Sequence, residues 1–224
     1  MKYSYSLLLL SGLILSAEDP VPVALARMDR NAAVFTGVST DITRVTHNAF
    51  LNSNHTETGT MLLKRPAPRD MRVLMTIAPP DQKTVSMQGE TAQVYIPNAK
   101  TLQVYDAAKF RALFDQFFLL GFGSSGKELS AAYDLSSLPG EAVNGEKTLH
   151  FQLIPKAKNV RDQLPKVELW LSDASGYPLQ QKLYFPNGDY QTITYSNLKV
   201  NPKIPDSALK LKPPKGVQTT YPGK

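Results

Sequence analysis

The segment VELWLSDASGYPLQQKLYFPNGDY, residues 167–190, alternates apolar and polar side chains on both sides of a short turn. Every second side chain of residues 167–171 is apolar, and this period of two is typical of a β-strand. Residues 173–176 connect it to a second alternating run, and the Asn-Gly pair at 187–188 is a strong hairpin signal. Because connections this short join antiparallel neighbours, the segment predicts an antiparallel sheet.

The same period recurs through much of the chain, and prolines stand at the ends of the alternating runs. Proline lacks the N–H group that a strand ladder needs, so it favours strand ends and edges. Further alternating runs lie at residues 71–77, 93–96, 102–105 and 149–153. In the run after 178, Leu179, Leu183 and Phe185 are expected on one face. We therefore predict an antiparallel meander of roughly nine to eleven strands.

Two segments follow a helical period instead. Near the start, Leu25, Met28, Ala32 and Phe35 recur at helical spacing. Residues 107–120 repeat large apolar side chains at the spacing i, i+3, i+4, i+7, i+8, namely Phe110, Leu113, Phe114, Phe117 and Phe118. We expect both helices to cover one face of a mainly β fold. The space enclosed between them and the sheet is either a filled core or a ligand cavity.

The N-terminus predicts export. Residues 1–17, MKYSYSLLLLSGLILSA, have a basic start, a short apolar run and small residues at the end, as a signal peptide does. The apolar run is shorter than the about 20 residues of a membrane-spanning helix. We expect residues 18–224 to form a single domain. The absence of cysteine excludes disulfides, thiolate metal sites and a lipid anchor on cysteine.

The charge pattern argues against nucleic acid as a partner. The formal net charge is +6, but the basic residues are scattered and form no stripe. Such a charge favours brief contacts with anionic membrane surfaces, which salt screens. We expect a periplasmic, soluble monomer.

The motifs that could indicate an enzyme do not meet the requirements of one. Residues 121–128, GFGSSGKE, partly match the dinucleotide and phosphate-loop patterns, but both need a strand before the glycines. Glu128 stands where the phosphate loop needs Ser or Thr, so a helix end followed by a hinge explains the glycines better. His47, His55 and His150 lack ligand spacing, His150 is expected at the surface, and no Gly-x-Ser-x-Gly elbow is present. We predict no catalytic residue, no metal and no cofactor.

Arg65 stands out in GTMLLKRP, residues 59–66. If this is a strand, Met61, Leu63 and Arg65 share a face, and Arg65 is either solvated at the strand end or points to a cavity rim. In the second case its five donors need partners, and carbonyl groups of a covering helix or loop would make it a latch. Methionines gather nearby, at Met61, Met71, Met75 and Met87. They suit a surface that accepts variable apolar shapes, or they fill an ordinary core.

Three stretches occur in this order in a known family, namely GTMLLKRPAP at 59–68, IAPPDQKTVSMQGETAQVYIPNAKTLQVY at 77–105 and FPNGDYQTITYSNLKVNPKIPDSALKLKPPKGV at 185–217. Through them the chain resembles the periplasmic outer-membrane lipoprotein carrier (LolA-like) family over nearly all of residues 18–224. Residues 121–135 and 155–165 depart from the family pattern. The departures leave room for a divergent branch with another lipid cargo.

The resemblance implies a fold class that is mainly β with covering helices (α+β). A single curved antiparallel sheet would form an unclosed β-barrel with a helical lid over an apolar cavity. In the family this cavity takes lipoprotein acyl chains from an inner-membrane release complex and hands them to an outer-membrane acceptor. The family's lid-latching arginine falls on Arg65, before Pro66, and its lid helices are similar to residues 107–120 and to the N-terminal helix.

We therefore predict a non-enzymatic periplasmic carrier of lipoprotein acyl chains or other lipids. Its cavity or lid is expected to consist of Leu25, Met28, Met61, Leu63, Met71, Val73, Met75, Phe110, Leu113, Phe114, Phe117 and Phe118. Arg65→Leu is expected to load cargo but to release it poorly. Two alternatives are a lipid-sensing or lipoprotein-sensing module of the same fold and an exported lipid hydrolase.

Overall fold

The computed structural model describes residues 19–67, 70–107 and 120–222. The predicted signal peptide and residues 108–119 of the predicted lid helix lie outside this part of the chain. The helices are α1 (Pro20–Val34), α3 (Gly126–Ala132), α4 (Lys158–Arg161) and the 3-10 helix η2 (Asp206–Leu209). The strands are β1 (Gly37–Asn48), β2 (Ser53–Ala67), β3 (Asp70–Ile77), β4 (Lys83–Gln88), β5 (Thr91–Ile96), β6 (Thr101–Asp106), β7 (Tyr133–Leu138), β8 (Ala142–Val143), β9 (Glu146–Pro155), β10 (Lys166–Ser172), β11 (Pro178–Tyr184), β12 (Tyr190–Val200) and β13 (Gln218–Thr220).

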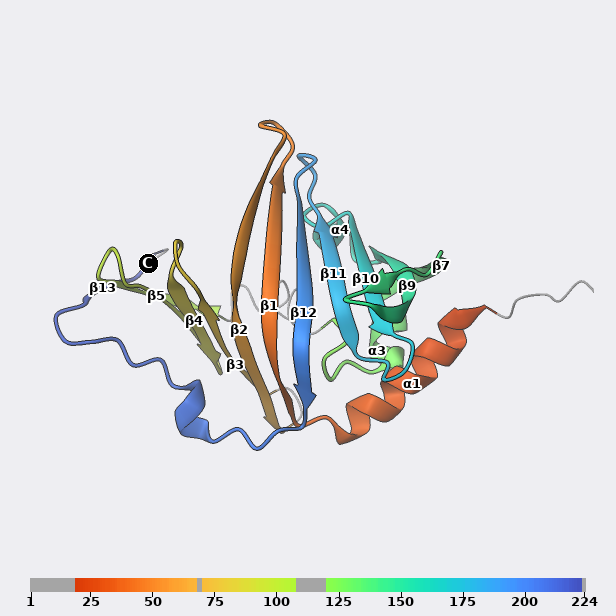
Figure 1. The fold of residues 1–224 in the computed structure, drawn as a ribbon, viewed down its shortest axis with the longest axis horizontal. Coiled ribbons are helices and arrows are strands. Elements are labelled where there is room, and N and C mark those ends of the chain that lie inside the picture. The colour runs from red at the N-terminus through yellow and green to blue at the C-terminus, as the bar shows by residue number, and fades with distance from the viewer. Residues whose placement is uncertain (1–18, 68–69, 108–119, 223–224) are drawn as a thin grey trace, which may run out of the picture.

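The described strands form one large curved sheet that does not close into a barrel (Figure 1). Their order is β13-β6-β5-β4-β3-β2-β1-β12-β11-β10-β9-β7, with β8 paired to β9. The predicted antiparallel sheet is confirmed, although β13 pairs with β6 in parallel. The thirteen strands exceed the predicted number, because β8 has two residues and β13 three, too few to show a period.

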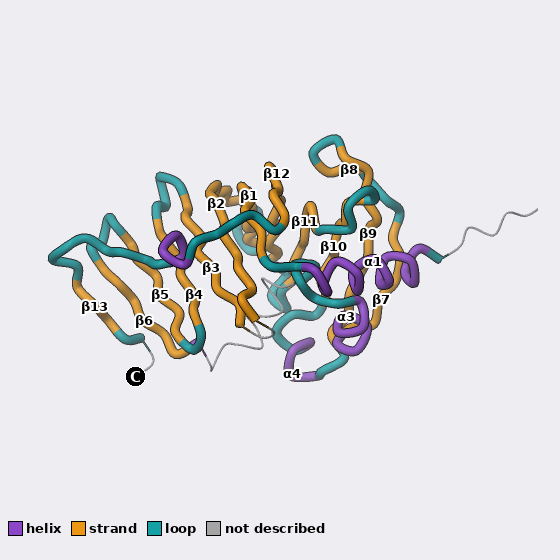
Figure 2. Tube along the Cα trace, turned by 90° about the horizontal axis from the view of Figure 1, so that it is seen from below, coloured by secondary structure: helices purple, strands orange, loops and turns teal. Residues whose placement is uncertain are grey.

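Helices α1 and α3 lie at the β7–β12 half of the sheet, whereas η2 contacts β3 in the other half. Figures 1 and 2 show α1 and α3 side by side, and α1 contacts α3, β7 and β9. We call the sheet face that they cover the inner face. It carries the main apolar core, to which α1, α3 and strands from both halves of the sheet contribute.

Strand β3 shows why the inner face is apolar. Met71, Val73, Met75 and Ile77 are buried, whereas the residues between them are partly exposed. This confirms the predicted face, since successive side chains of a strand point to opposite sides. The register pairs Met61 with Met75 and Leu63 with Val73, so β2 continues the same apolar surface.

Helix α1 begins after Asp19, whose carboxylate accepts a hydrogen bond from the Val21 N–H at 3.0 Å. Proline at its first position suits a helix start, because that N–H would have no partner inside the helix. The buried stripe is Ala24, Met28 and Ala32, so the predicted helical period is largely correct. Phe35 is buried too, but it lies in extended backbone beyond the helix.

Two features cover the opposite, outer face. The segment after β12 crosses it, and the Leu209 carbonyl accepts a hydrogen bond from the Gln88 amide at 2.8 Å. Trp170, Leu179 and Val143 form a second small core.

Two predictions about this face are wrong. A register shift between Trp170 and Leu171 places Leu179 with Trp170 instead of in the Leu183 stripe. His150 is largely covered, because its ring stacks on Trp170 with centroids 4.1 Å apart.

Candidate functional site

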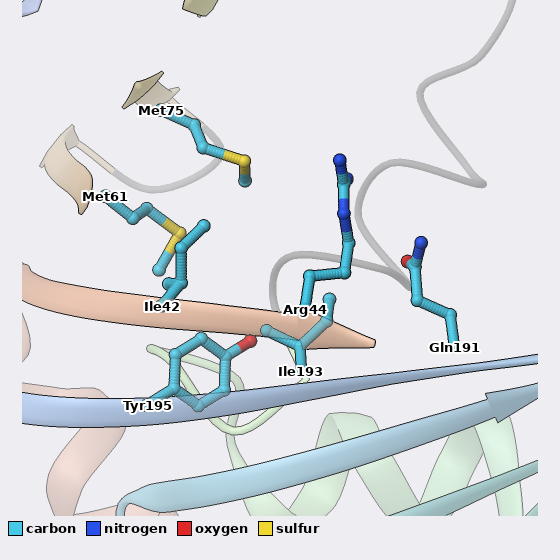
Figure 3. A pocket seen from close by; sticks show the side chains of 7 residues that line it. All are labelled: Ile42, Arg44, Met61, Met75, Gln191, Ile193 and Tyr195. Atoms are coloured by element: carbon cyan, nitrogen blue, oxygen red, sulfur yellow. The ribbon is translucent and has the colours of Figure 1, made fainter. Parts of the chain in front are cut away.

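The inner face holds a cavity of about 180 Å³ near the middle of the sheet. Its walls come from the adjacent strands β3, β2, β1 and β12, which the sheet order places side by side. The lining residues are Ile42, Arg44, Met61, Met75, Gln191, Ile193 and Tyr195 (Figure 3). The register brings Ile42 opposite Tyr195 and Arg44 opposite Ile193, so residues far apart in the sequence share one wall.

The cavity has an apolar part and a polar part. Figure 3 shows Met61, Met75 and Ile42 on one side, and Gln191 on the other with Arg44 between them. The methionine side chains are flexible and polarizable, so this wall adapts to apolar groups of different shape. The arrangement therefore suits a molecule with an apolar portion and a polar portion.

Tyr195 forms part of the wall and is 2% exposed. Its hydroxyl accepts a hydrogen bond from the Gln181 amide at 2.7 Å, and burial raises the pKa of the phenol. Phe122 packs edge to face on this ring, with centroids 5.0 Å apart, and is itself fully buried. Phe122 thus supports the cavity wall from the segment that precedes α3.

Arg65 points toward the inner face rather than into water at the strand end, although it does not line the cavity. Its Nη1 donates to the Gly123 carbonyl at 2.7 Å and its Nη2 donates to the Ala32 carbonyl. The guanidinium also lies 5.5 Å from the Phe35 ring centroid. Ala32 belongs to the last turn of α1, where carbonyls lack helical partners and a cation is favoured. Arg65 therefore ties the end of α1 to the segment that carries Phe122.

The glycines of GFGSSGKE have structural uses here. Gly121 and Gly123 adopt positive φ values of 88° and 77°, which L-residues with side chains rarely adopt. A Cβ atom on Gly126 would lie 2.2 Å from the Leu25 carbonyl oxygen, so glycine lets α3 approach α1. At the start of α3, the Glu128 carboxylate accepts the Ser125 N–H at 2.9 Å and occupies the position that a phosphate would need.

A charged cluster adjoins the cavity at Arg44. The Glu57 carboxylate accepts hydrogen bonds from Arg44 Nε at 2.7 Å and from Lys83 Nζ at 2.6 Å. Burial of Glu57 raises its pKa, but hydrogen bonds from Lys83 and Arg44 outweigh burial, and the net pKa is lowered. Glu57 is therefore an ionised, buried carboxylate shared by two cations.

His55, Glu57 and Asp81 offer ligand atoms within 4.8 Å of one another. The group does not suit a divalent cation, because both carboxylate oxygens of Glu57 already receive hydrogen bonds from Arg44 and Lys83. These two positive charges would repel a metal ion at the same carboxylate. His55 and Asp81 pair with each other at 3.0 Å on the exposed side.

The structure brings together only part of the predicted site. Met61 and Met75 line the cavity. The residues that belong to the surrounding core instead are Leu25, Met28, Leu63, Met71 and Val73. Pro66 is exposed beside Arg65. Five predicted lid residues lie outside the described part of the chain, namely Phe110, Leu113, Phe114, Phe117 and Phe118.

Sequence reasoning missed five lining residues, and all of them lie on two strands. Ile42 and Arg44 alternate in β1, whereas Gln191, Ile193 and Tyr195 alternate in β12. The period of two is present in both segments, and it indicates which side chains of each strand point to the same face of the sheet. What the sequence does not give is the pairing of β1 with β12.

No helix within the described residues is long and apolar enough to cross a membrane. No protein-family model matches the sequence, and no curated protein does. Among solved structures the chain is similar to MucB, at 14% identity and TM-score 0.54, over 86% of this chain and 62% of the MucB chain. It thus spans about three fifths of the MucB chain.

An uncharacterized conserved protein from Thermus thermophilus also matches, at 12% identity and TM-score 0.54, over 89% of this chain and 98% of that one. A LolA superfamily protein from Nitrosomonas europaea matches at 14% identity and TM-score 0.42, over 87% and 99% of the two chains. The predicted resemblance to LolA-like proteins is confirmed as a likeness of fold.

Proposed function

We propose that this chain is a periplasmic, non-enzymatic carrier that holds acyl chains of lipoproteins or other lipids and moves them from the inner to the outer membrane. The observation that supports this best is the cavity of about 180 Å³ on the inner face of the unclosed sheet. It is lined by the apolar side chains of Ile42, Met61, Met75 and Ile193 beside a polar end. The LolA-like fold is consistent with the proposal.

The size of the cavity limits what it holds without movement. A dry cavity of roughly 150 Å³ accepts an apolar group as large as benzene. The present cavity therefore takes one end of an acyl chain. Each further methylene that leaves water contributes about 0.8 kcal/mol, which favours displacement of the side chains that bound the cavity. Phe122 is the first candidate for displacement, because it packs directly on Tyr195.

In this proposal Arg65 sets how readily the cavity enlarges. Its hydrogen bonds to Gly123 and Ala32 hold the backbone next to Phe122 and the end of α1. Cargo that displaces Phe122 must strain or break these contacts, and their recovery favours release. Arg65 would then act as the latch that the resemblance implies.

The test is lipid capture in the protein's own compartment. The chain is exported to a bacterial periplasm with residues 1–17 intact, purified without detergent, and analysed by native mass spectrometry with lipid extraction. We expect co-purified acyl lipid. Ile193→Phe adds bulk inside the cavity and should lower the bound fraction, whereas Val23→Phe adds the same ring at an exposed position of α1 and should not.

Carriage is tested separately from binding. Vesicles that contain a fluorescent diacyl lipopeptide are mixed with unlabelled acceptor vesicles, and lipid transfer is followed with and without the protein. We expect transfer to accelerate in proportion to protein concentration and to fall with Ile193→Phe. A protein that captures lipid but leaves the transfer rate unchanged would favour the sensing module over the carrier.

A further inference from the structure

At the polar end of the cavity, two cations share one carboxylate. Arg44 and Lys83 have side chains that are 19% and 30% exposed, and both contact Glu57, which is 6% exposed. The three side chains carry a net charge of +1. Asp81 lies nearby, but it is 45% exposed and pairs with His55, so water screens its charge. A positive charge therefore remains on a wall whose other members are largely apolar.

Arg44 and Lys83 also have N–H groups that do not donate to Glu57. Arg44 directs Nε and Nη2 to the same oxygen of Glu57, and Lys83 donates to the other oxygen. A guanidinium has five N–H groups and an ammonium has three. Within the described residues, Nη1 of Arg44 and two hydrogens of Lys83 Nζ have no acceptor. The cluster thus has both the charge and the donors to bind an anion.

The position of Arg44 links these donors to the apolar cavity. Its stem forms part of the lining, and Figure 3 shows it between Gln191 and the methionines Met61 and Met75. The Gln191 amide lies on the same side as the guanidinium, and it has a second N–H beside the one that donates to Thr46 Oγ1 at 3.3 Å. A molecule whose chain end lies on the methionines would therefore place its head group beside Arg44.

We propose that the cavity favours lipids in which an apolar chain lies next to an anionic head, a phosphate or a carboxylate, and that Arg44 and Lys83 hold this head in competition with Glu57. The inference rests on the proposed acyl-chain binding and names the class of cargo. Arg44 is suited to the role, because its planar fork matches phosphate and carboxylate oxygens. Glu57 keeps the two cations together when the site is empty.

Three probes separate the contributions of head and chain. The purified protein is titrated calorimetrically with octyl phosphate, with octanol and with inorganic phosphate. We expect octyl phosphate to bind at least about tenfold more tightly than octanol, because a hydrogen bond to a charged group contributes at least that much to binding. Inorganic phosphate should bind far more weakly than octyl phosphate, because it gains nothing from the apolar wall.

Variants assign this preference to the cluster. Arg44→Gln should lower the affinity for octyl phosphate more than the affinity for octanol, so that the ratio of the two affinities falls toward one. Arg72→Gln makes the same charge change at an arginine that pairs with Asp70 and Asp206, and it should change neither affinity. Glu57→Gln removes the competitor and should tighten octyl phosphate several-fold. Glu168→Gln is its control, since Glu168 pairs with Lys166 away from the cavity.

Other results would overturn the proposal in distinguishable ways. Equal affinity for octanol and octyl phosphate would exclude head recognition but leave acyl-chain binding intact. Inorganic phosphate that binds as tightly as octyl phosphate would indicate a site for free phosphate. No binding of any probe by a protein with an unchanged circular dichroism spectrum would contradict the proposed function as well.

Discussion

Phe122 packs edge to face against Tyr195, with ring centroids 5.0 Å apart. Tyr195 lines the cavity, and the carbonyl of Gly123, the residue after Phe122, accepts a hydrogen bond from Arg65. Arg65 does not touch the cavity, yet only two contacts separate it from the wall. A change at Arg65 is therefore expected to reach the cavity through Phe122.

Arg65→Leu removes charged hydrogen bonds to the Gly123 and Ala32 carbonyls. Because Arg65 is only partly buried, we expect a loss of about 2 kcal/mol in the free energy of unfolding, measured in urea. Amide hydrogen exchange should accelerate in residues 120–125. In vesicle transfer the variant should load lipid and release it more slowly. Unchanged exchange in 120–125 would contradict the link to Phe122, and Arg72→Leu serves as the control.

Gly126→Ala tests the close approach of α1 and α3. Alanine normally favours a helix over glycine. Here the new Cβ would lie 2.2 Å from the Leu25 carbonyl oxygen, which belongs to the backbone and cannot rotate away. We expect a loss of about 1–3 kcal/mol, as for other overpacked sites. A gain in stability on urea unfolding would mean that the two helices separate easily.

Tyr133 predicts a loss of stability in alkali. Burial raises the pKa of its phenol from 10.0 to about 12. Between these two pH values the unfolded chain loses the phenol proton before the folded chain does. The contribution of the protonated phenol to the free energy of unfolding is therefore full below pH 10 and is lost as the pH rises through 12. At pH 11 the loss is about 1 kcal/mol.

Tyr133→Phe should therefore lose less stability than the unchanged protein between pH 9 and pH 11 in urea unfolding. Tyr221→Phe, at an exposed tyrosine, should behave like the unchanged protein. Identical pH profiles for Tyr133→Phe and the unchanged protein would show that Tyr133 does not titrate in this range.

Glu57 leads us to expect a loss of folding stability in acid, the opposite of the loss in alkali expected from Tyr133. Burial raises its pKa, yet the hydrogen bonds from Lys83 and Arg44 lower the pKa more, to below 4.5. Its contribution to stability is present above pH 4.5 and is lost as the pH falls through the folded-state pKa. Glu57→Gln should give a flatter unfolding profile between pH 7 and pH 3, whereas exposed Glu90→Gln should not. A profile as steep as that of the unchanged protein would place the acid sensitivity elsewhere.

The sequence predicted the inner face of the sheet well where burial is strictly one-sided. On β3 the buried side chains alternate without exception, so Met75 could be placed before the structure. The prediction failed at Leu179, because the register shift near Trp170 interrupts the alternation. No residue in the local sequence indicates this shift. Burial of His150 was missed for a related reason, since its cover comes from Trp170 on the neighbouring strand.

The site was predicted less well than the fold, and the reason is the distance along the chain. Ile42 and Tyr195 are register partners on β1 and β12, but most of the sequence lies between them. A period of two indicates which side chains share a face within one strand. It does not indicate which strands lie side by side, so the cavity emerges only once the strands are paired.

The three residues of β13 have a consequence for how this protein behaves in a crowded compartment. Without them β6 would end the sheet and offer its unpaired N–H and C=O groups to any extended chain. The parallel pairing of residues 218–220 with 101–103 occupies that ladder and leaves a much shorter edge in its place. Loss of the last seven residues should therefore favour strand-to-strand aggregation, a hazard for a molecule that, in the proposed function, also exposes an apolar interior when it exchanges cargo.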